Sequence, residues 1–415
     1  MTAGSVRMGK FVKYLPLFGW DPVVLTVEPK KNIAKGIPLE TESFKVVRTP
    51  YRDPVGIFST PPPVGEGDKG GFSKGKSGYH FVKRTLKRIS PFTIQRMPDR
   101  MLGWYPYAVK AGKKILEWDG IDAVFSSHPS PVNHLVAAEL SGRTGVPWVA
   151  DYRDLWTGST LRPYPGRLEA VERRYERKVL KRAGALTTVS DTLRDYLADL
   201  HGKPVEVIYN GFDPEDFERE AKKEDVKRFT VIYSGTLYTL KQSPVPLFEA
   251  LKRLREKGII SEENFRVRFI GVQEPPFRDL VNEYGLETLV VSEPFQPYEE
   301  NVATLKGADA LLFFSWNEGE MEGNPTSKIF QYAGAGRPIL VVGKGNPFVV
   351  EFVKETSTGE IGGQSQEIMR ILTRWMEAFT RDGNVGYSPD RKGLERYDRK
   401  VQTRQLAGIL NKVVM

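Results

Sequence analysis

The clearest indication of the fold is the stretch of residues 310–342, which reads ALLFFSWNEGEMEGNPTSKIFQYAGAGRPILVV. Short apolar runs lie near its two ends, at 311–314 and 339–342, and Pro325 or Thr326 would start a helix between them. A short apolar run, a helix and a second apolar run are typical of a strand–helix–strand unit in a parallel sheet. This stretch therefore predicts an α/β fold.

The same alternation extends through the rest of the chain. Helical periodicity marks the segments 132–140, 168–180 and 247–254. We therefore expect two Rossmann-like, doubly wound lobes, residues 1–200 and 205–385, with ligands in the cleft between them at the carboxyl ends of the strands. The other apolar runs lie at 23–27, 123–125, 148–150, 186–189, 205–208, 230–233, 267–270 and 289–291.

The two ends of the chain depart from this regular pattern. A doubly wound lobe should begin with a strand, but the chain opens with MTAGSVRMGK, which resembles the turn after a first strand, followed by a helix at 8–15. The first strand of the N-terminal lobe is therefore expected to be missing. A last helical pattern at 394–413 makes residues 391–415 a candidate to pack on the first lobe.

Composition limits the chemistry that is open to this chain. Its 415 residues include no cysteine, which excludes disulfides, thiolate metal sites and cysteine nucleophiles. The four histidines show no metal-ligand spacing, and no Asp-x-Asp pair is available for a divalent ion. We therefore expect no cofactor and a metal-independent mechanism.

Charge is unevenly distributed between the halves. Residues 1–200 hold 32 Lys and Arg against 20 Asp and Glu, whereas the remainder holds 29 against 32. The basic half suits phosphate groups, anionic lipid or nucleic acid, and an ordinary solvated surface explains it equally well. No nucleic-acid motif supports that partner. Apolar runs fall far below the roughly 18–20 residues of a membrane span and no signal peptide is seen, so we expect a cytoplasmic protein.

The segment around the predicted helix start is a candidate anion site. The first backbone N–H groups of a helix, here at Thr326 and Ser327, lack intrahelical partners and bind anions well. Lys328 adds a positive charge in the first turn, where it disfavours the helix unless an anion is bound. An ordinary capped helix with a solvated lysine remains the alternative.

Two neighbouring loops offer further candidates. Gly235 follows the apolar run 230–233 and lets the backbone approach a ligand, while Lys241 could reach the same phosphates. A plain strand-to-helix turn is the alternative. In the acidic loop 317–323, Glu320 and Glu322 could bind sugar or ribose hydroxyls, or could simply be solvated.

The first lobe contributes two segments. Residues 151–156 (DYRDLW) follow the run 148–150, so Asp151 and Arg153 would either form an ion-pair scaffold or hold acceptor hydroxyls. His128 follows the run 123–125 and is itself followed by Pro129 and Pro131, and its ring should point over the strand ends into the cleft. A structural histidine is the alternative.

Together these segments resemble glycosyltransferase family 4, a family of retaining enzymes with the GT-B fold. The resemblance extends from the GSVR turn at 4–7 to the C-terminal helix, and its most specific parts are 151–156, 209–213 (YNGFD), 234–237 (SGTL) and 325–338 (PTSKIFQYAGAGRP). Members that build surface polysaccharides or lipid-linked oligosaccharides are the most similar.

The resemblance implies transfer of a sugar from a nucleotide diphosphate-sugar to a hydroxyl acceptor on a glycan or a lipid-linked glycan, with possible contact to an anionic membrane. It implies catalytic positions at His128, Lys241 and Lys328, with His128 near the transferred sugar and both lysines on the diphosphate. The implied substrate-binding residues are Gly4, Ser5, Asp151, Arg153, Gly235, Thr236, Glu320, Glu322, Asn324, Thr326, Ser327 and Gln331.

Three positions depart from the family pattern. Thr236 stands where the family often has arginine, and the family's paired glutamates fall on Gly323 and Gln331. Gln331 can still bind ribose hydroxyls, but without charge. Two alternatives therefore stay open, a catalytically degenerate nucleotide-sugar-binding protein and a sugar-nucleotide epimerase.

Overall fold

The computed structural model describes residues 3–28, 44–51, 100–118, 120–158, 167–222, 227–237, 242–272, 275–315 and 326–415. The chain forms two compact units. Unit 1 comprises Met1–Tyr14, Val189–Thr192 and Ile208–Gln405, and unit 2 comprises Leu15–Thr188, Leu193–Val207 and Leu406–Met415.

Unit 1 is built on a six-stranded parallel sheet in the order β12-β11-β10-β7-β8-β9. The order reverses at β7, which lies between β10 and β8. In open α/β sheets the ligand crevice lies beyond the carboxyl ends of the strands at such a reversal. The strands are β7 (Phe229–Ser234), β8 (Phe265–Ile270), β9 (Val290–Glu293), β10 (Ala310–Phe314), β11 (Ile339–Val342) and β12 (Gly359–Gly362).

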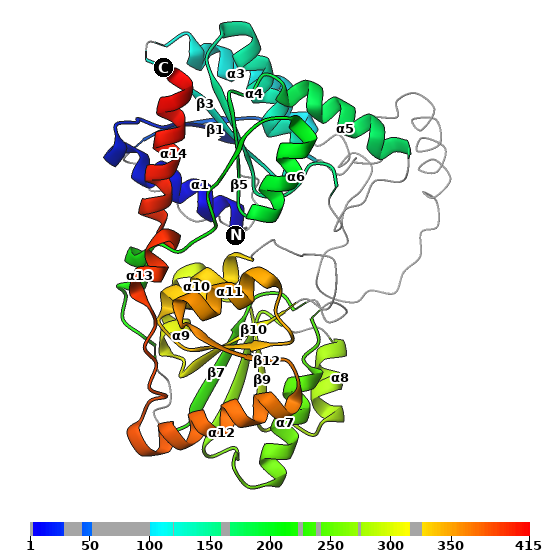
Figure 1. Ribbon diagram of the computed structural model, residues 1–415, viewed down its shortest axis with the longest axis vertical. Coiled ribbons are helices and arrows are strands. Elements are labelled where there is room, and N and C mark those ends of the chain that lie inside the picture. The colour runs from blue at the N-terminus through cyan, green and yellow to red at the C-terminus, as the bar shows by residue number, and fades with distance from the viewer. Residues whose placement is uncertain are drawn as a thin grey trace, which may run out of the picture. The chain divides into compact units, whose positions relative to one another are not determined.

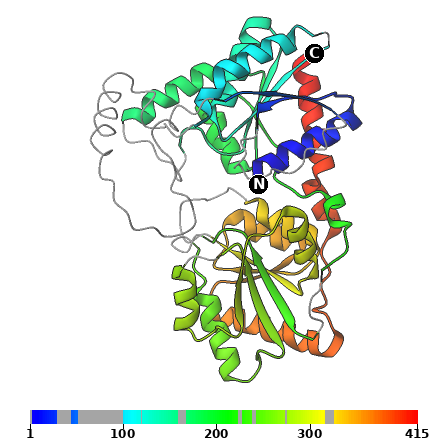
Figure 2. The same cartoon turned by 180° about the vertical axis from the view of Figure 1, so that it is seen from behind.

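Helices cover both faces of this sheet, as Figure 1 shows and Figure 2 repeats from behind. Successive residues of a strand point to opposite faces. Leu312 and Phe314 therefore pack under α7, α8 and α12, while Leu311 and Phe313 pack under α9, α10 and α11. The helices are α7 (Val245–Glu256), α8 (Pro275–Glu283), α9 (Tyr298–Gly307), α10 (Ser327–Ala335), α11 (Pro347–Thr356) and α12 (Ser365–Asp382).

Unit 2 contains a four-stranded parallel sheet, β3-β4-β5-β6, and a separate parallel pair, β1-β2. The pair packs with α3 and α4 around Trp104, Val132 and Leu140. Its elements are β1 (Val23–Val27), β2 (Lys45–Thr49), α3 (Tyr105–Leu116), β3 (Val124–His128), α4 (Pro131–Thr144), β4 (Trp148–Tyr152), α5 (Arg167–Leu180), β5 (Ala185–Thr188), α6 (Asp191–His201) and β6 (Val205–Val207).

The ends of the chain differ from what the sequence predicts. Helix α1 (Ala3–Tyr14) already includes residues 4–7, so the predicted turn there is wrong. Helix α1 groups with residues 208–405 and not with the first lobe. The predicted helix 394–413 is interrupted: α13 (Arg391–Leu394) and a 3-10 turn precede α14 (Arg399–Val414), whose residues divide between the units at 405 and 406.

In the part of the chain that the structure describes, no helix is both long enough and apolar enough to span a membrane.

Candidate functional site

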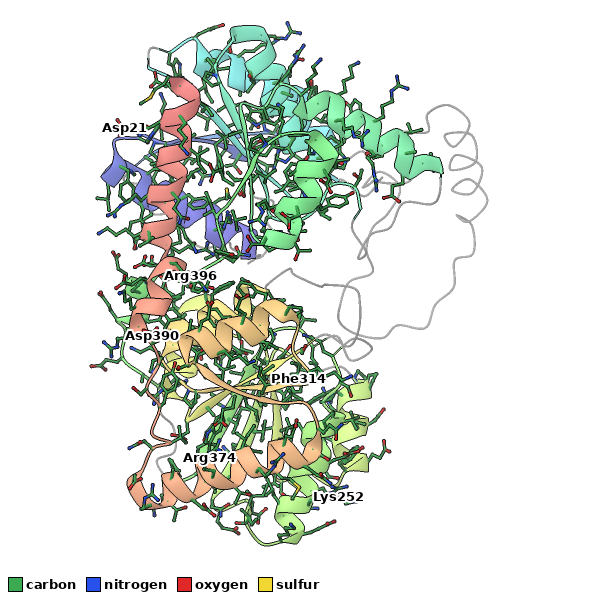
Figure 3. All side chains as sticks on the ribbon, in the orientation of Figure 1. Asp21, Lys252, Phe314, Arg374, Asp390 and Arg396 are labelled. Carbon is green, nitrogen blue, oxygen red and sulfur yellow. The ribbon has the colours of Figure 1, made fainter. Side chains whose placement is uncertain are left out.

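Two segments that the sequence singles out meet at the carboxyl end of β7. Gly235 follows β7 with a φ of +110°, and its N–H donates to the Ile270 carbonyl at 2.9 Å. A Cβ built on Gly235 would lie 3.2 Å from Nζ of Lys328, the second residue of α10. The backbone angle favours glycine here, and a side chain at this position would also crowd the ammonium of Lys328. Figure 3 labels Phe314, which ends β10 on the neighbouring strand.

Within the described residues, an aromatic side chain and no carboxylate contacts the ammonium of Lys328. Nζ donates to the Tyr233 hydroxyl at 2.6 Å and lies 3.9 Å from the centroid of that ring. Among the described residues, no Asp or Glu oxygen forms an ion pair with it. Burial lowers the pKa of Lys328 to about 7, because the surrounding protein replaces the water that would stabilise the charge. The site thus holds a positive charge that lacks an anionic partner within the described chain.

The start of α10 also suits an anion. Thr326 takes the N-cap position in an extended conformation, but its side chain makes no cap hydrogen bond. Its Oγ1 is buried and finds no hydrogen-bond partner within the structure described. No acidic residue lies in the first turn. Backbone N–H groups, the helix dipole and Lys328 therefore combine in one place that suits an anion.

Another face of α10 borders a small cavity of about 50 Å³. Ser327 and Gln331, one helical turn apart, line it beside Val6 and Lys10 of α1. The remaining lining residues are Gly211, Phe212, Asp213, Asp216, Phe217, Tyr298 and Arg399.

The YNGFD motif at 209–213 binds α1 next to this cavity through Asp213. Lys10 Nζ contacts Asp213 Oδ2 at 2.6 Å and Asp216 Oδ1 at 2.5 Å, and the Tyr14 hydroxyl donates to Asp213 Oδ1 at 2.7 Å. Burial alone would raise the pKa of Asp213, but the hydrogen bonds from Lys10 and Tyr14 bring it below its usual value. The carboxylate of Asp213 is therefore a structural anchor for α1.

Asp151 of unit 2 also has a structural position. It lies inside β4 and is fully buried, so its predicted place after the strand is wrong. Its carboxylate accepts from Ser127 Oγ at 2.7 Å and from Thr187 Oγ1 at 2.8 Å, residues that flank it on β3 and β5. Arg153 pairs with the adjacent Asp154 at 2.9 Å. These contacts favour the scaffold interpretation of the DYRDLW segment.

His128 is the last residue of β3, and its side chain is only 3% exposed. Its ring stacks at 5.8 Å from His134 and 5.9 Å from Tyr152, whose hydroxyl donates to the buried Glu176 at 2.8 Å. The predicted position of this ring in the cleft stays a prediction. Its burial among rings favours a structural histidine.

Several predicted site residues cannot be placed. Lys241, Glu320, Glu322 and Asn324 lie outside the described residues. Gly4 and Ser5 lie in the first turns of α1, and their side chains are not described. The roles of all six stay predictions.

The sequence missed two tyrosines at this site. Tyr233 holds Lys328, and the Tyr332 hydroxyl accepts the Ser234 N–H at 2.9 Å. Both tyrosines lie among buried apolar residues, so the sequence pattern did not indicate that their hydroxyls have a role at the site.

Comparisons with known proteins agree with the motifs. The model of Glycosyltransferase Family 4 matches residues 72–216, about a third of the chain. Two curated relatives are each described as a putative colanic acid biosynthesis glycosyltransferase WcaL. The one from Salmonella typhimurium is 24% identical over 247 residues, 57% of this chain and 58% of the relative. The one from Escherichia coli K12 is 28% identical over 170 residues, 39% of this chain and 40% of the relative. The matches thus span less than two thirds of either relative.

Solved structures share the fold across nearly the whole chain. Anabaena HepE, in complex with UDP and glucose, has a TM-score of 0.57 at 15% identity and covers 94% of this chain and 99% of its own. A glycosyltransferase from Rickettsia africae has a TM-score of 0.61 at 13% identity, and the match covers 100% of this chain and 96% of the Rickettsia chain. Sucrose-phosphate synthase from Thermosynechococcus elongatus has a TM-score of 0.60 at 13% identity, and the match covers 99% of this chain and 93% of the synthase. These similarities confirm the predicted GT-B fold class.

Proposed function

We propose that this protein transfers a sugar from a nucleotide diphosphate-sugar to a hydroxyl acceptor. The observation that carries the proposal is the Lys328 ammonium, which lies at the start of α10, beside the Gly235 turn and without a carboxylate partner in the described chain. A leaving diphosphate gains negative charge as the sugar departs. Positive groups fixed in advance at that place stabilise the transition state, usually the largest single catalytic contribution.

The individual roles follow from the geometry and from the family resemblance. Lys328 and the backbone of Ser327 would bind the diphosphate, with the Gly235–Thr236 backbone allowing close approach. Gln331 would bind ribose hydroxyls. Gly4, Ser5, Lys241, Glu320, Glu322 and Asn324 keep the roles that the resemblance implies. Retention of configuration and independence of metal belong to the proposal as well, and full turnover in excess EDTA is the expected sign of the latter.

The acceptor is proposed to be a growing polysaccharide or a lipid-linked glycan at the cytoplasmic face of a membrane. Both curated relatives are described as putative glycosyltransferases of colanic acid biosynthesis, which concerns a polysaccharide. The basic first half adds a means of approaching an anionic surface. Helix α5 and the residues that follow it expose Arg174, Lys178, Lys181 and Arg182.

Nucleotide binding tests the proposal first. Calorimetric titration with UDP-, GDP- and ADP-sugars should identify one donor, and Lys328→Ala should weaken its binding by about 1.5–3 kcal/mol, the usual value for a hydrogen bond to a charged group. Lys252→Ala is the matched control, since this exposed lysine lies on α7 over the other face of the sheet (Figure 3). Equal binding by the parent and Lys328→Ala would remove Lys328 from the site.

One observation favours a second candidate, a nucleotide-sugar-binding protein without turnover. The position of a family glutamate is taken by Gln331, and the nearby carboxylates of Asp213 and Asp216 are already bonded to Lys10. Binding of a donor with no hydrolysis and no transfer would support this candidate. Conversion of the donor to another sugar nucleotide without acceptor would instead indicate an epimerase.

A further inference from the structure

Tyr233 occupies a place that its hydrophobic surroundings alone do not explain. Its ring is fully buried, with ring centroids of Phe269 and Phe314 at 5.5 Å and 5.3 Å. Packing on both sides fixes the ring, so its hydroxyl has one available position. That hydroxyl lies at the carboxyl end of β7, where the Gly235 turn begins.

The hydroxyl joins the lysine to the turn. It accepts from Lys328 Nζ at 2.6 Å and donates to the Thr236 carbonyl at 2.7 Å. An ammonium has three N–H donors. One is directed to Tyr233, which leaves two for a ligand, while the ring face below attracts the same charge. A long, flexible side chain is thereby held in one orientation.

We propose that Tyr233 is a positioning residue, which holds the Lys328 ammonium beside the Gly235 turn. The backbone of the turn and the charge of Lys328 can then contact the same diphosphate. Tyr233 acts through Lys328 and does not touch the ligand. The inference rests on the proposed function, since it presumes that Lys328 binds the diphosphate.

The groups around Lys328 make this role measurable through pH. Strand β7 contributes Tyr233, and α10 itself contributes Tyr332, whose hydroxyl is bonded to Ser234. The turn 234–237 (SGTL) and β10 (Ala310–Phe314) carry no charged residue. The Tyr233 hydroxyl is therefore the main neutral dipole that favours the charged form of Lys328.

The sign of the effect follows from this arrangement. Burial has already lowered the pKa of Lys328 to about 7. Diphosphate affinity should be full below that pH and should fall as the pH rises through it. Without the hydroxyl the ammonium loses one hydrogen bond that favours its charged form, so we expect the fall in affinity to begin at a lower pH.

The test is calorimetric titration of UDP, GDP and ADP between pH 6 and pH 9 into the parent, Tyr233→Phe, Lys328→Met and the double variant. With the nucleotide that binds the parent best, Tyr233→Phe should bind about threefold more weakly at pH 6 and about tenfold or more at pH 8. In the Lys328→Met background, Tyr233→Phe should add nothing. Tyr387→Phe is the control, because the Tyr387 hydroxyl is buried and forms no hydrogen bond in the described structure.

Melting temperatures show whether each variant is folded.

The outcomes distinguish a failure of the proposed role of Tyr233 from a failure of the proposed function. If Lys328→Met loses binding while Tyr233→Phe keeps the affinity and pH profile of the parent, Tyr233 is only a packing residue. If the parent binds none of the three nucleotides, the proposed function fails and the positioning role fails with it.

Discussion

His128 is the residue for which the sequence and the structure differ most. Two nearby prolines suggested a stiff segment with an outward ring, whereas the ring is buried against His134 and Tyr152. The strand continues past its apolar run because β4 and α4 satisfy the polar side chains beyond that run: Ser126 bonds to Trp148 and His134, and Ser127 to Asp151. A pattern of apolar residues alone cannot show such bonding.

Truncation of that ring should affect stability more than turnover. His128→Ala removes a buried side chain and leaves a cavity, which should cost on the order of 2–4 kcal/mol. We expect a lower melting temperature with activity per folded molecule preserved. Trp118→Ala is the control, because that side chain is 37% exposed and should tolerate the change better. If the variant keeps the melting temperature of the parent but loses turnover, His128 has a catalytic role and not a structural one.

The histidine beside it predicts a pH dependence of stability. Burial lowers the pKa of His134 to about 3, with Asp151 acting against that shift and His201 adding to it. An unfolded chain binds the proton near pH 6.5. The unfolded state therefore gains protons first, and stability should fall as the pH drops below about 6.5. The melting temperature of the parent should decrease from pH 7 to pH 5 more steeply than that of His134→Gln, and parallel curves would contradict this.

At the scale of elements, the sequence predicted the interior strands and the edge strands β1, β3, β6 and β9, but it missed the edge strands β2 and β12. Strands β10 and β11 are buried on both faces and so form uninterrupted apolar runs. Strands β2 and β12 lie at sheet edges and carry exposed or small residues, which gave no such run. The helix predicted at 394–413 is interrupted because Asp398, in extended conformation, accepts the Lys400 N–H at 2.7 Å and starts a new helix.

Two glycines inside helices should respond in opposite ways to alanine. A Cβ on Gly334 of α10 would lie 2.5 Å from Phe217 Cε2 and 2.8 Å from Phe212 Cδ2, whereas nothing lies within 4 Å of one on Gly408 of α14. Gly408→Ala should therefore stabilise by about 0.5–1 kcal/mol through helix propensity. Gly334→Ala should lower the melting temperature, because the rings that anchor α10 must shift. Stabilisation by both changes would show that α10 is not closely packed there.

For the whole molecule, the uneven charge and the two-unit organisation were both evident in the sequence. The sequence predicted an anion site at the start of α10, where Lys328 lies beside Gly235, and that site stays a prediction. The grouping of α1 with residues 208–405 was not foreseeable, since it depends on ion pairs between Lys10 or Lys13 and residues some 200 positions away. Pairings at such separation leave no local pattern.

The basic half makes a prediction for the intact protein. Sedimentation with anionic vesicles should recover the protein at low salt and lose it as salt rises, because exposed charges are screened beyond about 10 Å at 0.1 M salt. Charge reversal at Arg174 and Lys178 should reduce the bound fraction, while reversal at Lys252, exposed on α7, should not. Binding that does not respond to salt would count against an electrostatic membrane contact.

The most direct test of the central claim is release of nucleoside diphosphate during transfer. With the donor found by titration and a polysaccharide or lipid-linked acceptor, the parent should release one diphosphate for each sugar transferred, in excess EDTA as well as without it. Lys328→Ala should lower that rate by about tenfold or more, the usual effect of losing a charge fixed at the leaving group, and Lys252→Ala should not. Equal rates for the parent and Lys328→Ala would contradict the account, because the diphosphate would then leave from some other part of the molecule.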